Sequence, residues 1–84
     1  MLTINYFASL RETLGDAREQ LSLPPGTATV ADLIDHLVGQ RDERWAILKN
    51  SEQVLVAVDQ TIVSRSHPLS GTEELAFFPP MTGG

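Results

Sequence analysis

One stretch of this 84-residue chain has the pattern of a long amphipathic helix, and it limits what the chain can fold into. Its apolar residues recur at intervals of three and four, and they are Val30, Leu33, Ile34, Leu37 and Val38. This spacing places them on one face of a helix of about 10–12 residues. Thr29 and Asp32 supply polar residues that start such a helix. Because an apolar helix face must be buried, the rest of the chain has to supply a surface that covers it.

The segments around this helix show the two-residue alternation of β-strands. They are residues 1–7 and 18–23 before the helix and residues 54–58, 61–63 and 74–78 after it. Side chains alternate between the two faces of a strand, so most of these segments present one apolar face to a core. Residues 54–58 are apolar on both faces, which predicts a central strand. Residues 41–53 are interpreted as an irregular connection with a short turn, anchored by Trp45.

A short helix is expected between the first two strands. Ser9 and Glu12 have the spacing of a capping box, in which the hydroxyl caps the helix start and the carboxylate reaches back. Leu10 and Leu14 share one face, and Gly15 is suited to ending the helix in a left-handed conformation.

This order of elements predicts an α+β fold. The simplest arrangement is a mixed sheet of four to five strands with the long helix on one face, which is a β-grasp, or ubiquitin-like, roll. We expect one domain over residues 1–80, followed by a flexible tail at residues 81–84. A ferredoxin-like fold would require a second long helix, and no segment after Val54 supplies one.

Composition excludes several function classes. The chain has no cysteine, which excludes a disulfide framework, a thiolate metal site, a cysteine nucleophile and a cysteine-bound persulfide. A formal charge of −5 argues against nucleic-acid binding, which requires clustered basic residues. No apolar run approaches the roughly 18–20 residues that cross a bilayer, and no signal peptide is evident, so we expect a cytoplasmic protein without membrane contact.

The last six residues, Pro79-Pro80-Met81-Thr82-Gly83-Gly84, are the strongest functional signal. The prolines favour an extended path away from the sheet. Glycines have no Cβ atom, so they can pass through a narrow channel in another protein. They also leave the carbonyl of Gly84 open to attack. Conversion of its carboxylate to an acyl-adenylate would supply a leaving group, and sulfur attack would then give a thiocarboxylate. Such a sulfur carrier needs no cysteine.

Other candidate residues are weaker. His36 and His67 lack clustered ligands, so no metal site is expected. The chain has no phosphate-binding glycine loop and should not bind ATP alone. The acidic pairs 42–43 and 73–74 are interpreted as solvated surface. Phe77 is assigned to the core, whereas Phe78 faces outward, either contacting a partner or packing under a local loop.

The chain closely resembles the small subunits of molybdopterin synthase in residues 56–63, 67–69 and 74–84, and residues 6–15 share that likeness. The resemblance spans essentially the whole chain and is most specific in the last eleven residues. Asp59 stands where asparagine is common in that family and Met81 where valine is common. Neither departure touches the reacting carbonyl.

The resemblance implies a covalent cosubstrate with no bound cofactor. A ubiquitin-activating-like adenylyltransferase would use ATP to adenylate Gly84, and a sulfurtransferase system would convert it to the thiocarboxylate. The tail would then enter the large synthase subunit. The partner-binding residues would be Phe78, Pro79, Pro80, Met81, Thr82 and Gly83. There the sulfur would build the dithiolene of molybdopterin from cyclic pyranopterin monophosphate, in an assembly of two small and two large subunits. Catalytic residues would belong to the large subunit.

Three alternatives stay open. A thiamine-pathway sulfur carrier shares the fold and tail, although the block from Phe77 to Pro80 and the chain length favour the molybdopterin family. A ubiquitin-like modifier would use the same adenylate with lysine acceptors. A structural β-grasp adaptor would need no free terminus.

Overall fold

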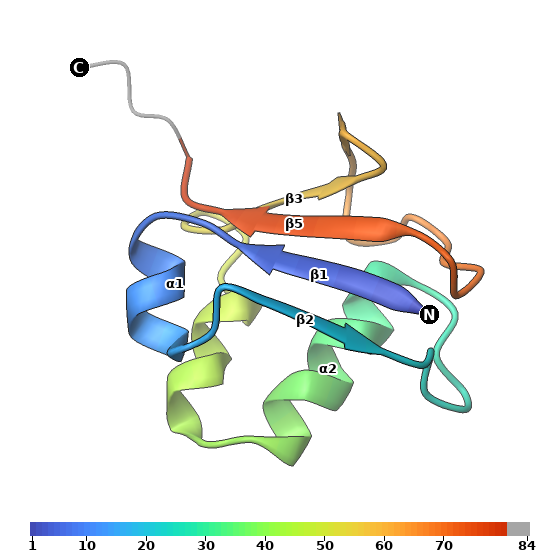
Figure 1. The fold of residues 1–84 in the computed structure, drawn as a ribbon, viewed down its shortest axis with the longest axis horizontal. Helices are drawn as coiled ribbons and strands as arrows, with labels where there is room; N and C mark the ends of the chain where they lie inside the picture. The colour runs from blue at the N-terminus through green and yellow to red at the C-terminus, as the bar shows by residue number, and fades with distance from the viewer. Residues whose placement is uncertain (81–84) are drawn as a thin grey trace.

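The computed structural model describes residues 1–80, which form one mixed β-sheet with helices against one of its faces (Figure 1). In chain order the elements are β1 (Leu2–Tyr6), α1 (Ser9–Leu14), β2 (Arg18–Leu21), α2 (Val30–Gln40), the 3-10 helix η1 (Glu43–Lys49), β3 (Leu55–Val58), β4 (Thr61–Ile62) and β5 (Glu74–Phe78). The expected tail at residues 81–84 lies outside the described part. No helix within residues 1–80 combines the length and apolar character needed to cross a membrane.

The first and last strands lie side by side in the middle of the sheet. Its order is β2-β1-β5-β3-β4, with β1 and β5 parallel and the remaining pairs antiparallel. β1 and β2 form a hairpin widened by α1, as the sequence predicts, and the whole topology is the expected β-grasp roll. β3 has a partner on both sides, in keeping with its two apolar faces, but the middle position belongs to β5.

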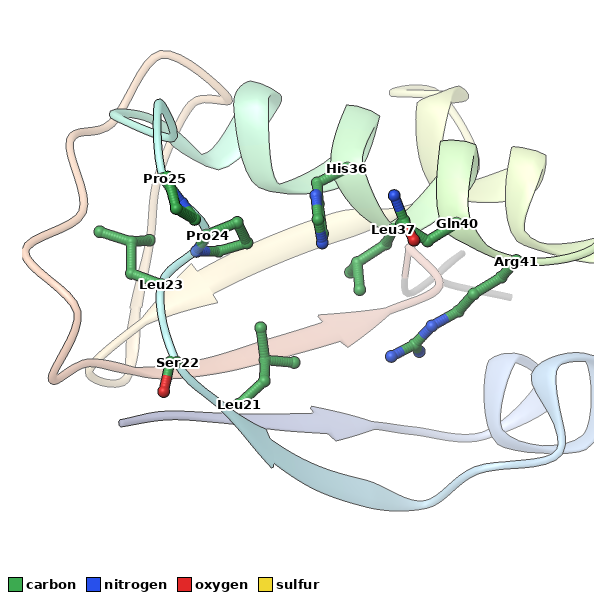
Figure 2. A pocket seen from close by; sticks show the side chains of 9 residues that line it. All are labelled: Leu21, Ser22, Leu23, Pro24, Pro25, His36, Leu37, Gln40 and Arg41. Carbon is green, nitrogen blue, oxygen red and sulfur yellow. The ribbon is translucent and has the colours of Figure 1, made fainter.

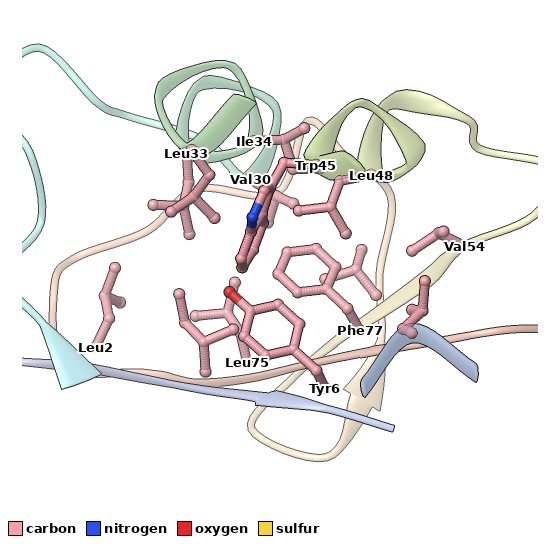
Figure 3. Packing of buried hydrophobic residues seen from close by; sticks show 14 of the residues in the cluster. Leu2, Tyr6, Val30, Leu33, Ile34, Trp45, Leu48, Val54, Leu75 and Phe77 are labelled. Carbon is pink, nitrogen blue, oxygen red and sulfur yellow. The ribbon is translucent and has the colours of Figure 1, made fainter. Parts of the chain in front are cut away.

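The core lies between α2 and the sheet (Figure 3). Val30, Leu33, Ile34 and Leu37 are buried as predicted, and Val38 packs at the margin. On the sheet side, the rings of Tyr6 and Phe77 stack with their centroids 5.9 Å apart. Trp45 of η1 meets Tyr6 edge-on at 5.3 Å, so the indole anchors the connection between α2 and β3 as expected. That connection is more regular than predicted, because η1 occupies seven of its residues.

The sequence predicts polar residues at the starts of α1 and α2, and a capping box is present only at α2. At α2 the capping box is present: the Asp32 N–H donates to the Thr29 hydroxyl at 3.2 Å, and the Thr29 N–H donates to the Asp32 carboxylate at 3.1 Å. At α1 the predicted box is wrong, because the capping residue is Ala8, with no side-chain cap.

The cause of this difference lies in the sheet. The Phe7 N–H donates to the Phe77 carbonyl at 3.1 Å, which extends strand pairing to the residue before the turn. Ala8 then reverses the chain at a φ of 54°, and Ser9 is already helical. The predicted end of α1 is confirmed, since Gly15 has a φ of 82° and donates to the Arg11 carbonyl at 3.0 Å.

Candidate functional site

The last residues of β5 direct the chain out of the core. Strand alternation turns Phe77 toward the helices, where it is 0% exposed, and turns Phe78 to the opposite face, where it is half-buried. Phe78 pairs with Leu55 of β3. The outward orientation predicted for Phe78 is therefore correct, and this side chain lies on the sheet face that α2 does not cover.

Apolar side chains gather on that uncovered face. We call them the outer apolar patch: Phe7, Leu55, Ala57, Ile62, Ala76 and Phe78. The strand register makes the patch continuous, because Leu55 pairs with Phe78, and Ala57 pairs with Ala76 on one side and with Ile62 on the other. Phe7 and Ile62 are 49% and 63% exposed, respectively. Exposed apolar clusters of this kind mark interaction surfaces on small proteins.

Sequence reasoning identified only part of the patch. The alternation predicted along residues 1–7 places Phe7 on the face opposite the core, and Phe78 was singled out, but Leu55 and Ile62 were assigned no surface role. The available signal was the apolar character of both faces of residues 54–58. One face of that strand, with Val56 and Val58, enters the core, and the other, with Leu55, enters the patch.

A second feature lies beside the root of the tail. Pro79 and Pro80, both half-buried, line an open hollow of about 400 Å³. Its other walls come from α1, η1 and the turn before β3, through Ser9, Leu10, Ile47, Glu52 and Gln53. The prolines thus pack against the domain at the corner where the described residues end. The structure brings together Phe78, Pro79 and Pro80 at this corner, whereas Met81, Thr82, Gly83 and Gly84 lie outside the described residues.

The corner presents few groups for acid–base chemistry of its own. Glu52 is the carboxylate that lines the hollow, and it is exposed. Within residues 1–80, no group of three histidine, cysteine or acidic side chains is placed to hold a metal ion. His36 lies on the exposed side of α2, and His67 lies in a loop, where its carbonyl accepts a hydrogen bond from the Val30 N–H at 3.0 Å.

Comparisons with known proteins agree with this geometry. The ThiS family profile matches residues 4–84. The molybdopterin synthase sulfur carrier subunit of Escherichia coli is 45% identical over 85 residues, and the alignment covers 100% of both chains. A structure described as putative molybdopterin converting factor, subunit 1, from Pyrococcus furiosus is 28% identical, with a TM-score of 0.73 over 95% of this chain and 97% of that one.

A second solved structure belongs to a protein named for a different role. The small archaeal modifier protein 1 of Haloferax volcanii is 25% identical to this chain, with a TM-score of 0.71. The match covers 95% of this chain and 97% of the archaeal one. Similar folds thus occur under both names.

Proposed function

The chain belongs to the ThiS family, and on that premise we propose that it is the sulfur-carrier subunit of a molybdopterin synthase. The observation that carries the proposal is the 45% identity, over the full length of both chains, to the E. coli subunit of that name. The matched region includes the terminal Gly83-Gly84 pair.

The reacting group in this proposal is the carboxylate of Gly84. A ubiquitin-activating-like adenylyltransferase joins it to the AMP part of ATP and releases pyrophosphate. A sulfur nucleophile supplied by a sulfurtransferase system then displaces AMP and leaves the thiocarboxylate. Because the chain has no cysteine, this terminal acyl group is the place where it carries sulfur. The chain itself binds no cofactor in this cycle.

The domain contributes by holding and aiming the tail. β5 has a paired strand on each side and ends at Phe78, so Pro79 and Pro80 follow directly from a strand that is held at both edges. Four residues beyond Pro80 extend at most about 13–14 Å. A partner's active site must therefore lie within that distance of the surface on which the domain docks. We assign this docking surface to the outer apolar patch, because it adjoins the root of the tail through Phe78.

The first partner is the large synthase subunit, which binds cyclic pyranopterin monophosphate and supplies the catalytic residues. The thiocarboxylate sulfur bonds to a substrate carbon as an oxygen leaves that carbon, and water then cleaves the bond between the sulfur and the Gly84 carbonyl carbon. Because a dithiolene holds two sulfur atoms, each product consumes two charged carriers. The carrier returns as a carboxylate, ready for another cycle in the cytoplasm. The same patch serves the adenylyltransferase, so the two partners exclude each other.

Intact mass spectrometry tests the proposal. Incubation with the adenylyltransferase, ATP and a sulfur source should produce the mass change of one oxygen exchanged for sulfur. Adding the large subunit and the pterin precursor should reverse that change and form dithiolene product. Deletion of Gly84 shifts the acyl carbon by one residue, about 3.3–3.6 Å, and should abolish product. Normal sulfur donation by the truncated chain would contradict the proposal, whereas a β-grasp adaptor would tolerate the deletion.

A second candidate function is protein modification, favoured by the likeness to the small archaeal modifier protein 1. It begins from the same adenylate but ends in an amide bond to a lysine of another protein. The two functions separate in one experiment. With adenylyltransferase, ATP and a lysine-bearing acceptor protein but no sulfur source, a modifier forms conjugates whose mass is that of the acceptor plus this chain minus one water. A sulfur carrier accumulates only the adenylate and its hydrolysis product.

A further inference from the structure

Two arginines of the described chain are half-buried, and they are held in different ways. Arg41 lines the hollow between β2 and α2 (Figure 2), where the Glu19 carboxylate accepts two of its hydrogen bonds. Arg65, which follows β4, has no carboxylate within ion-pair distance among residues 1–80. Its guanidinium donates instead to two backbone carbonyls, those of Leu48 and, at 2.8 Å, of Val54. A half-buried charge that binds only backbone groups fixes the chain at those two points.

The two carbonyls lie at the ends of an exposed turn. Leu48 is in η1 and Val54 directly precedes β3. Between them the chain closes on Asn50, whose carbonyl accepts from the N–H groups of Gln53 and Val54 at 3.1 and 3.0 Å. The side chains of residues 50–53 are exposed, so the core does not hold them. The planar guanidinium binds both ends of the turn at once and thereby keeps them at a fixed separation.

The backbone that carries Arg65 is itself held in place. The Ala31 N–H donates to the Arg65 carbonyl at 2.8 Å, and the Val30 N–H donates to the His67 carbonyl at 3.0 Å. Both N–H groups belong to the first turn of α2, where no helical carbonyl is available to them. Arg65 therefore connects the start of the long helix with the turn at residues 50–53.

This turn forms one wall of the hollow at the root of the tail. Glu52 and Gln53 line the hollow together with Pro79 and Pro80. Proline has no N–H group, so neither proline can donate to a neighbouring strand as the residues of β5 do. Their position consequently depends more on packing against the walls of the hollow. A shift of the turn would move Pro80, from which the last four residues begin.

The strand register brings the guanidinium close to the same point. Leu55 is paired with Phe78, the last residue of β5. Continuing this antiparallel register by one residue sets Val54 opposite Pro79. One of the two carbonyls that Arg65 binds therefore belongs to the residue opposite the first proline.

We propose that Arg65 is a positioning residue for the carboxyl-terminal tail. By binding both ends of the turn at residues 50–53, it holds the wall on which Pro79 and Pro80 pack, and so sets where the last four residues begin. The inference rests on the function proposed for Gly84, because a reacting chain end needs an accurately placed starting point. A misplacement of about 1 Å can lower a rate by about 100-fold. Arg65 acts through the turn and not on the reacting group.

NMR of the free, full-length chain tests the contact itself. Arg65→Met removes both hydrogen bonds, whereas Arg65→Lys keeps the charge but replaces the fork with a single ammonium. The amide resonances of the turn and the Cδ resonances of Pro79 and Pro80 should shift in the Met variant and shift less in the Lys variant. Arg18→Met is the matched control, because it removes the same charge from the exposed start of β2, and it should leave these resonances unchanged. Unshifted proline resonances in both Arg65 variants would overturn the proposal.

Sulfur donation to the large subunit, from chains prepared as the thiocarboxylate, tests the consequence. Arg65→Met should lower kcat about tenfold and leave KM within about twofold of the wild-type value, because the outer apolar patch is intact. The Arg18→Met control should keep both constants. A rise in KM at unchanged kcat would assign Arg65 to the docking surface and overturn the proposal, as would wild-type kcat in both Arg65 variants.

Two further measurements keep the outcomes separate. Denaturant unfolding shows whether each variant is folded, and a smaller loss of kcat in Arg65→Lys tests the proposal if the Met variant does not fold. If the wild type donates no sulfur, the proposed function fails, whereas the NMR shifts still decide whether Arg65 holds the wall of the hollow.

Discussion

The guanidinium of Arg41 binds the carboxylate of Glu19 through two hydrogen bonds of 2.6 Å each. Arg41 directly follows α2, and Glu19 lies in β2, so the pair ties the long helix to the edge strand. The Tyr6 hydroxyl donates to the same carboxylate at 2.8 Å, and the guanidinium lies 4.3 Å from the centroid of the Trp45 ring. Hydrogen bonds from Arg41 and Tyr6 lower the pKa of Glu19, while burial and the neighbouring Glu19 raise the pKa of Tyr6.

A double-mutant cycle with Glu19→Gln and Arg41→Met should give a coupling free energy of about 1.5–3 kcal/mol, because bidentate bonds between half-buried charges are strong. The two side chains are only 19% and 28% exposed. Asp42 and Arg44 form the control pair, with side chains 52% and 54% exposed, and should couple much more weakly because water screens their charges. Urea unfolding measures both cycles, and equal coupling in the two pairs would contradict this assignment.

Phe77 and Phe78 are adjacent residues with opposite expected effects. Phe78→Ala should weaken binding to the large subunit or to the adenylyltransferase by about 1–3 kcal/mol and leave folding largely intact, because its ring lies on the outer apolar patch. Phe77→Ala should instead destabilise the fold by about 3–5 kcal/mol, because its ring is fully buried. Titration calorimetry and denaturant unfolding separate the two effects. Unchanged affinity for both partners in Phe78→Ala would remove that residue from the interface.

Leu33 tests the packing of α2 on the sheet. It is 0% exposed, and Leu33→Ala should lower the free energy of unfolding by about 2–5 kcal/mol, a large part of the stability of a small domain. Val38→Ala, at the half-buried margin of the same stripe, should cost only about 1 kcal/mol. Denaturant unfolding of both variants shows which substitution lowers the free energy of unfolding more. The Val38 substitution would have the larger effect if the helix were rotated about its axis.

The charge of Glu73 makes the free energy of unfolding depend on pH in the acid range. Although burial opposes the shift, the N–H groups of Ser70 and Gly71, at 2.8 and 2.9 Å from its carboxylate, lower the pKa of Glu73 from 4.5 to about 2. The carboxylate therefore stabilises the fold above pH 4.5, and this contribution is lost as the pH falls toward 2. The sequence-based interpretation of this residue as solvated surface missed its capping role.

The measurement is the free energy of unfolding at a series of pH values for the wild type and Glu73→Gln. The variant should be less stable at neutral pH, and the difference between the two proteins should shrink below pH 4.5. A difference that stays constant from pH 6 to pH 2 would show that the Glu73 charge adds nothing to the loop.

Local patterns located the two α-helices and the strands of this fold, but not η1, which was expected as an irregular connection. The stripe from Val30 to Val38 gave the length and the buried face of α2, and two-residue alternation located the strands. Side-chain direction in a helix or strand repeats with the local backbone geometry, so these features are readable from neighbouring residues. The carboxyl-terminal glycines were singled out for a related reason, because the prediction of a reactive chain end rests on the residue types at that end.

Only the tertiary structure decided which distant residues meet. β5 lies between β1 and β3, and this placement puts Phe7, Leu55, Ile62 and Phe78 on one continuous surface. It also lets the Phe77 carbonyl bind the Phe7 N–H, which displaced the cap predicted at Ser9. Arg41 and Glu19 are 22 residues apart and meet only because α2 crosses the sheet beside β2. Strand order and such contacts depend on burial of the whole core, which local periodicity does not encode.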